Sequence, residues 1–300
     1  MRKERIKEKN DSTSATLDID LKNPIVKAVH ISLMIVMIII SLTFIIPVLW
    51  VLLSSFKETK EFFQVPPAIF PEKFDFSKIA YVWEKAGLGK VYLSTIYMML
   101  GSLIVSLASN GLAGYVLSRL KPRGSQLVVV LVLWSMMMPG GLSMVPLFIS
   151  FTKEIPILGR NLMDSYIPLW MMSGASAFNV LLFKGFFDGI SKSYLEAARI
   201  DGCSEVGIFT KIVMPLSKPV FMSVSIFVFT GGWGNFMWPY LLIKDENLMP
   251  IGVRTYLLQP VLPQDEYFMM LIFVILPPII FFCIFQKYIM GGVSLGGVKG

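Results

Sequence analysis

A short charged passage in the second half of the chain holds the residues whose types and spacing could do chemistry. It runs from Ser193 to Gly202 and carries Glu196, Arg199 and Asp201. Ser193 followed three residues later by Glu196 is a capping-box pattern, which predicts that a helix begins there. Gly202 predicts the end of that helix, because glycine enters the left-handed conformation without a side-chain penalty.

A second short helix is expected directly after the first. Ser204 can cap it, and Pro215 ends or kinks it. Two short helices joined by a tight turn make a compact projection from the surface, which we call the knob. Its side chains are small at Ala197 and Ala198. Such a knob suits a partner's cleft, where the alanines admit the partner's backbone and Glu196 offers an ion pair or hydrogen bond. An ordinary surface helix with a convenient cap is the alternative interpretation.

Other chemistries lack the residues that they need. His30 is the single histidine, which argues against a histidine metal centre or proton relay. Cys203 and Cys283 indicate neither a disulfide nor a metal site. The sequence has no Gly-x-x-x-x-Gly-Lys-Ser/Thr loop for ATP and no nucleophile constellation. The chain is therefore predicted to have no catalytic residue, metal or cofactor of its own. Any process in which it takes part that needs energy would draw that energy from another subunit.

The composition places these residues in a membrane protein. Apolar residues make up 55% of the chain and charged residues only 16%, against roughly 25% charged in soluble domains. Six runs without charge each approach or exceed the roughly 20 residues of a membrane-spanning helix. They are 31–53, 91–118, 125–150, 165–183, 219–243 and 267–286. The predicted fold class is an all-α membrane protein with six transmembrane helices, and the charge-free spans argue against ion coupling.

The placement of Lys and Arg predicts the orientation. If the N-terminus is cytoplasmic, the segments on that side hold 17 of these residues and the outer segments hold 10. The knob then faces the cytoplasm, and the net charge of +7 is an orientation signal rather than a nucleic-acid surface. The basic turn 119–124 is expected to meet lipid headgroups, with contact to an ATPase as the alternative. Small residues along the second span predict close helix packing.

The charged passage resembles the cytoplasmic signature loop, or EAA loop, of permease subunits in binding-protein-dependent ABC importers. The resemblance is carried by Glu196, Ala197, Ala198, Gly202, Ile212 and Pro215. Met214 stands where the family usually has leucine. The resemblance implies a type I ABC importer permease fold, with a six-helix domain at 29–290 and a coupling loop at about 185–215. Cytoplasmic tails would then lie at 1–28 and 291–300.

The same resemblance implies a set of partners in a bacterial inner membrane. They are a second permease subunit, two copies of a cytoplasmic ATPase that bind ATP and Mg, and an extracytoplasmic solute-binding protein. The residues expected to couple to the ATPase are Glu196, Ala197, Ala198, Arg199, Asp201, Gly202 and Pro215. Glu196 would pair at the ATPase cleft, while the small residues would allow a close fit.

Features of the outer loop and the C-terminal tail resemble the sugar permeases, such as the smaller membrane subunit of the maltose importer. They are Ser55-Phe56-Lys57, Pro67-x-x-Phe70-Pro71, Tyr81 and the glycine-rich end of the chain. They imply a carbohydrate substrate, more an oligosaccharide or polysaccharide-derived chain than a monosaccharide. An importer of another solute and a membrane scaffold or sensor without transport stay open as alternatives.

Two predicted spans are interrupted, the third at Pro139 and the fifth at 231–235. Broken backbone at membrane depth is tolerated where it is buried in protein or lines a cavity. Trp233, Asn235 and Trp238 combine aromatic faces with a neutral amide, which suits sugar rings and hydroxyls; we place them, with Trp134, in a substrate pathway. Tryptophan anchoring at the membrane interface is the alternative.

Overall fold

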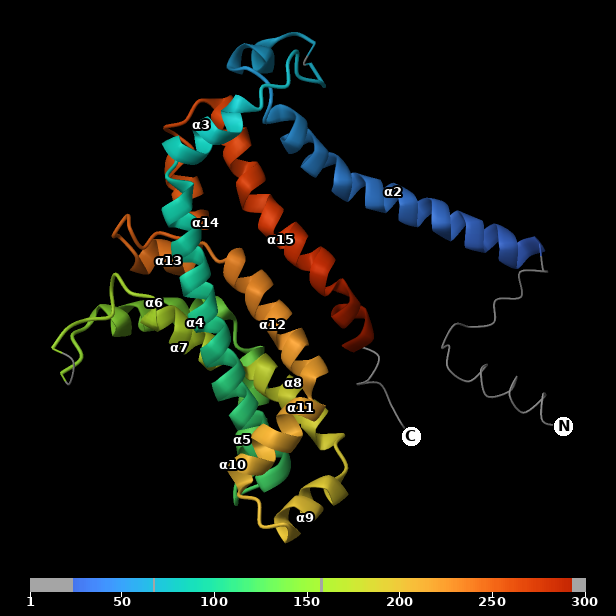
Figure 1. Ribbon diagram of the computed structural model, residues 1–300, viewed down its shortest axis with the longest axis vertical. Coiled ribbons are helices and arrows are strands. Elements are labelled where there is room, and N and C mark those ends of the chain that lie inside the picture. The colour runs from blue at the N-terminus through green and yellow to red at the C-terminus, as the bar shows by residue number, and fades with distance from the viewer. Residues whose placement is uncertain (1–23, 67, 157–158, 293–300) are drawn as a thin grey trace.

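The computed structural model describes residues 24–66, 68–156 and 159–292 (Figure 1). Within those ranges every regular element is a helix, so the predicted all-α class is confirmed. The tails predicted at 1–28 and 291–300 lie mostly outside the described residues.

Long apolar helices alternate with short helices along the chain. The helices of the first half are α2 (Pro24–Ser54), η1 (Thr59–Phe63), α3 (Ser77–Lys85), α4 (Leu88–Tyr115), η2 (Val116–Leu120), α5 (Ser125–Met137) and α6 (Gly140–Thr152). Those of the second half are α7 (Ile167–Gly174), α8 (Ala177–Asp188), α9 (Lys192–Ile200), α10 (Glu205–Ile208), η3 (Phe209–Val213), α11 (Met214–Leu216), α12 (Lys218–Trp233), α13 (Met237–Leu242), α14 (Ile251–Leu258) and α15 (Gln264–Gly292). The segments η2 and η3 are π-helical turns.

Helix α4 is the centre of the bundle and packs against α7, α8, α12 and α14. Two of the small residues of the second predicted span, Gly101 and Gly114, lie at these contacts. A Cβ atom on Gly101 would overlap the Trp170 ring, and one on Gly114 would lie 2.6 Å from the Cβ of Phe183. The helices therefore approach at distances that only glycine permits at these two positions.

The predicted count of six membrane spans is not confirmed. Among the described residues, three helices are long and apolar enough to cross a membrane, or up to five if each bent pair is one span. The third predicted span is broken as expected, because α5 and α6 meet at 101° next to Pro139. The fifth is broken between Trp233 and Met237, where α12 gives way to α13.

The fourth predicted span, 165–183, is not one helix. It divides into α7 and α8 at Ala175 and Ser176. The Ser176 hydroxyl caps α8 by accepting from the Asn179 N–H, and the Asn110 side chain on α4 accepts from the Ser176 N–H. This break contains no proline, and it is held by polar contacts from another helix, which explains why the apolar sequence alone did not predict it.

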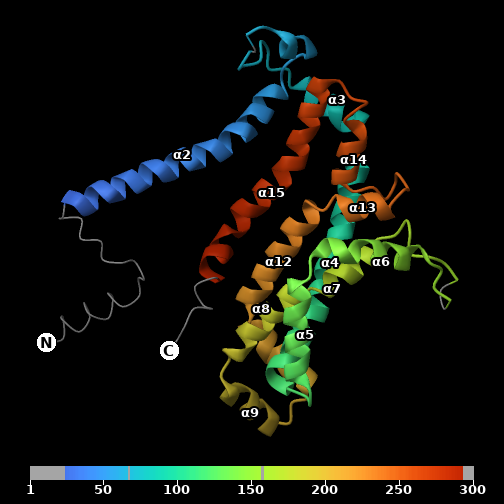
Figure 2. The same ribbon diagram turned by 180° about the vertical axis from the view of Figure 1, so that it is seen from behind.

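Helix α2 stands apart from the rest of the molecule. Its C-terminal end meets α15, and the remainder extends away from the other helices (Figures 1 and 2). Of its residues, all of them described, only Ser54 is buried. With a mean hydropathy of 2.9 over its most apolar stretch, α2 is long and apolar enough to cross a membrane, and its apolar surface away from α15 is uncovered.

Candidate functional site

The first candidate site is the projecting loop formed by α9 and α10. Helix α9 begins at Lys192, and its cap is Ser191, whose hydroxyl accepts from the Ser193 N–H at 3.4 Å. The capping box predicted from Ser193 and Glu196 is therefore wrong. The serine that caps the helix lies two residues earlier, so the Glu196 carboxylate is not used at the helix start.

The end of α9 is as predicted. Gly202 has a φ of +77°, and its N–H donates to the Arg199 carbonyl at 3.1 Å. The Cys203 N–H donates to the Ala198 carbonyl at 2.9 Å. These two bonds form a Schellman motif, which satisfies carbonyls at the helix end. The following helix, α10, is capped by the Ser204 hydroxyl, as the sequence predicts.

Pro215 lies in the three-residue helix α11, directly after the π-helical turn η3. The bend of 80° between this segment and α12 falls at Ser217, two residues beyond the proline. Pro215 is exposed, and it lies at the junction where the loop joins the membrane helix.

One face of the loop is packed into an apolar cluster. Leu195 and Ala198 of α9 are buried in it together with Phe187, Ile208 and Phe209. Ala198 is only 5% exposed, so its methyl group contacts its own chain rather than an outside partner. Burial of this face fixes the orientation of α9 relative to the helix bundle.

The opposite face carries the exposed residues of the signature. Glu196, Ala197 and Asp201 are exposed, and within the described chain Glu196 makes no hydrogen bond or salt bridge. Ile200 lies one helical turn from Glu196 and is 86% exposed. A free carboxylate beside an uncovered apolar side chain is a surface that a protein partner could cover.

A carboxylate that the sequence analysis missed holds the two helices together. Glu205 accepts from the Arg199 Nε at 2.8 Å and from the Tyr115 hydroxyl at 2.9 Å. The hydrogen bond that Arg199 donates to the Glu205 carboxylate raises the pKa of Arg199. Tyr115 ends α4, so this cluster ties the loop to the central helix. The sequence did offer a signal for this ion pair, because Glu205 lies only six residues after Arg199 and has the opposite charge. Arg199 therefore acts as a residue that holds the loop in position.

Replacement of Glu205 by alanine should loosen this loop. We expect the backbone amides of residues 192–208 to exchange with solvent about fivefold faster, because an exposed ion pair with a second hydrogen bond contributes roughly 1 kcal/mol. Hydrogen exchange followed by mass spectrometry measures this. Glu196→Ala on the same loop is the matched control and should leave exchange unchanged. Equal acceleration in both variants would show that Glu205 does not hold the loop.

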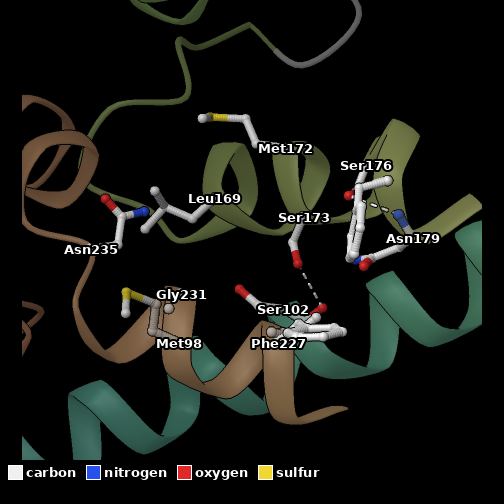
Figure 3. A pocket seen from close by; sticks show the side chains of 13 residues that line it. Met98, Ser102, Leu169, Met172, Ser173, Ser176, Asn179, Phe227, Gly231 and Asn235 are labelled. Atoms are coloured by element: carbon white, nitrogen blue, oxygen red, sulfur yellow. Dashed lines mark hydrogen bonds between the residues drawn. The ribbon is translucent and has the colours of Figure 1, made fainter. Parts of the chain in front are cut away.

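The second candidate site is a cavity of about 370 Å³ between α4, α7, α8 and α12 (Figure 3). It is lined by Met98, Ser102, Leu169, Met172, Ser173, Ser176, Phe178, Asn179, Phe227, Val228, Gly231, Gly232 and Asn235. Every one of these side chains is uncharged. Hydroxyl and amide groups face thioether and aromatic groups across it, which suits a neutral ligand with many hydroxyls.

The polar wall of the cavity is fixed by the break between α7 and α8. Asn110 donates from its Nδ2 to the Ser106 hydroxyl at 2.9 Å and to the Ser173 carbonyl at 3.0 Å. The Ser173 hydroxyl donates to the Ser102 carbonyl at 3.1 Å (Figure 3). The buried Asn110 thus holds the interrupted backbone beside the cavity, as expected of broken helices at membrane depth.

The structure brings one of the four predicted pathway residues to this cavity, namely Asn235. Trp233 is buried, and its Nε1 donates to the Val274 carbonyl at 3.0 Å. Trp238 is half-buried against Phe151. Trp134 lies on α5 and is 63% exposed. The aromatic side chains that do line the cavity, Phe178 and Phe227, were not predicted.

Comparisons with known proteins agree on one kind of protein. Residues 110–294 match the family described as binding-protein-dependent transport system inner membrane component. The arabinooligosaccharides transport system permease protein AraQ of Bacillus subtilis (strain 168) is 32% identical over 279 residues, covering 90% of this chain and 96% of that protein. The diacetylchitobiose uptake system permease protein NgcG of Streptomyces coelicolor is 29% identical, covering 85% and 84%.

A solved structure has the same fold. A chain of a bacterial ABC transporter involved in the import of the acidic polysaccharide alginate superposes with a TM-score of 0.72. It is 24% identical in sequence, and the superposition covers 92% of this chain and 99% of that chain. The likeness extends over nearly the whole length of both chains.

Proposed function

Because the chain belongs to the family of binding-protein-dependent transport system inner membrane components, we propose that it forms half of the translocation pathway of an ATP-driven carbohydrate importer. The family consists of the membrane permeases of ABC transporters, which are non-catalytic subunits working with an ATPase and a binding protein. The proposed cargo is an oligosaccharide or a polysaccharide-derived chain, since the relatives AraQ and NgcG are named for such sugars.

The observation that carries the proposal is the uncharged cavity beside the break between α7 and α8. A sugar offers hydroxyl groups for hydrogen bonds and apolar ring faces for aromatic contact, and the lining supplies partners for both. Ser102, Ser173 and Asn179 are the polar partners, with Phe178 and Phe227 as the aromatic walls. The position of the cavity between the helices of a bundle is a common place for a small-molecule site.

The loop of α9 and α10 is proposed to dock into a cytoplasmic ATPase, of which two copies bind ATP and Mg. Glu196 and Ala197 face outward for that contact, while Arg199 and Ala198 hold the loop in shape. The excess of Lys and Arg on the same side supports an orientation with this loop and both termini in the cytoplasm.

A second permease subunit is proposed to cover α2. This helix has 31 residues and leaves its own bundle, so its apolar sides have no cover within the described chain except near Ser54. Beyond its contact with α15, the helix extends away from the other helices, which leaves room for a partner beside it (Figure 2). With α2, α4, α15, the two bent pairs and the pair α7 and α8, the chain would cross the membrane six times.

Reconstitution of the chain with its ATPase, second permease and binding protein tests the proposal. We expect uptake of radiolabelled oligosaccharide into vesicles that depends on ATP inside and on the binding protein outside. Thermal-shift measurements on the binding protein across oligosaccharides, amino acids and phosphate should show stabilisation by the oligosaccharides. Stabilisation by another solute class would overturn the carbohydrate assignment, and absence of ATP-dependent uptake would overturn the importer itself.

A further inference from the structure

A larger cavity, of about 880 Å³, lies where η2 turns into α5. It is lined by Leu117, Lys121, Gly124, Ser125, Gln126, Leu127, Val129, Val130 and Lys184. The lining comes from η2, from the turn after it, from the first turns of α5 and from α8. It shares no residue with the cavity proposed for the substrate.

The cavity lies at the end of a membrane crossing. The apolar helix formed by α4 and η2 runs over Leu88–Leu120, and the apolar α5 begins at Ser125. The turn between them therefore falls at the depth of the lipid headgroups, on the side of the bundle that carries α9 (Figure 1). None of the α5 side chains, all of them described, is buried in the chain, so its valine and leucine side chains are left uncovered by this chain.

The charges of this cavity are unevenly paired. Lys184 binds the Asp188 carboxylate at 2.7 Å, and the same carboxylate accepts from the Ser118 hydroxyl at 2.7 Å. Lys121 forms no salt bridge within the described residues, and its charge acts on Asp188 only from a distance, because that carboxylate is already bound by Lys184. Arg119 cannot replace it, because its guanidinium points inward and donates to the Phe187 and Ile190 carbonyls.

We propose that this cavity binds the headgroup of an anionic phospholipid. The phosphate lies against the Lys121 ammonium, with Ser125 and Gln126 offering polar contacts, and the acyl chains run along Leu127 and Val130 of α5. A basic pocket between membrane helices with an apolar wall has the chemistry of a lipid site. The apolar wall favours a lipid over a soluble anion, because a soluble anion would leave that wall uncovered.

A photoreactive phosphatidylglycerol tests this site in the complete importer. The importer is placed in vesicles of equal amounts of phosphatidylcholine and phosphatidylglycerol, and labelled peptides are mapped by mass spectrometry. We expect labelling within residues 117–130 that unlabelled phosphatidylglycerol displaces and phosphatidylcholine does not. Lys121→Gln should weaken the labelling about fivefold, the effect of one lysine beside an anionic lipid surface.

The neighbouring Arg123 provides the matched control. It lies in the same turn and carries the same charge but does not line the cavity, so Arg123→Gln should leave labelling unchanged. Equal loss in both variants would overturn the proposal in favour of diffuse surface charge. Displacement by soluble glycerol 3-phosphate would overturn it in favour of a free phosphate ester. Labelling that appears only in the isolated chain would show that a partner subunit fills the cavity, which also overturns it.

Discussion

Glu196→Lys is expected to abolish ATP-driven uptake while the chain still folds and inserts in the membrane. The side chain is exposed and makes no hydrogen bond or salt bridge with another described residue. Its charge acts on Arg199 only from a distance, and Arg199 keeps its ion pair with Glu205, so we expect the fold to be retained. At the proposed ATPase cleft, however, it places an ammonium where a carboxylate should pair. Loss of one partner of a buried charge pair costs 2–5 kcal/mol or more, which corresponds to at least about thirtyfold weaker association.

Two readouts separate this effect from misfolding. Affinity purification of the membrane subunits should recover much less ATPase with Glu196→Lys, and uptake in vesicles should fall to the level without ATP. Glu154→Lys, which makes the same charge change on an exposed residue after α6, should behave as the unaltered protein. Glu196→Gln keeps the shape and should give an intermediate loss. Normal uptake with Glu196→Lys would remove the carboxylate from the proposed contact.

The ends of the loop helices were predictable because their signals are local. Gly202 ends α9 and Ser204 caps α10, since each residue satisfies backbone groups within a few positions of itself. The start of α9 was misplaced because Ser191 and Ser193 are both residue types that cap helices, and the structure uses Ser191. Local sequence therefore offers two starts and does not decide between them.

The break between α7 and α8 was not predictable from local signals. Its backbone is held by Asn110, which lies 66 positions earlier in the chain and reaches the Ser176 N–H. An apolar segment with no proline gives no sign of such a distant partner. The tryptophans that we predicted for a substrate pathway show the same limit, because the type of a residue does not reveal where its side chain points. Trp233 directs its Nε1 to the Val274 carbonyl and not to the cavity.

Gly114→Ala is expected to destabilise the folded chain, although the same substitution in an open helix position would stabilise it. A Cβ atom at Gly114 would lie 2.6 Å from the Phe183 Cβ and 3.0 Å from the backbone nitrogen of Lys184, and both atoms are held in place by α8. Helices α4 and α8 would have to separate, and overpacking of this kind costs about 1–3 kcal/mol. Thermal unfolding of the purified protein should shift downward by several degrees.

Gly89, near the start of α4, is the matched control, because an added Cβ would meet no described atom within 4 Å. Gly89→Ala should stabilise the protein by about 0.4–1 kcal/mol, since alanine narrows the conformations of the unfolded chain. The opposite signs of the two changes in melting temperature separate the effect of the helix contact from the effect of helix propensity.

Because Gly114 precedes Tyr115, separation of α4 from α8 should also displace the Tyr115 hydroxyl that donates to Glu205. Gly114→Ala should therefore weaken ATP-driven uptake as well as stability. An upward thermal shift for Gly114→Ala would mean that the two helices do not approach this closely.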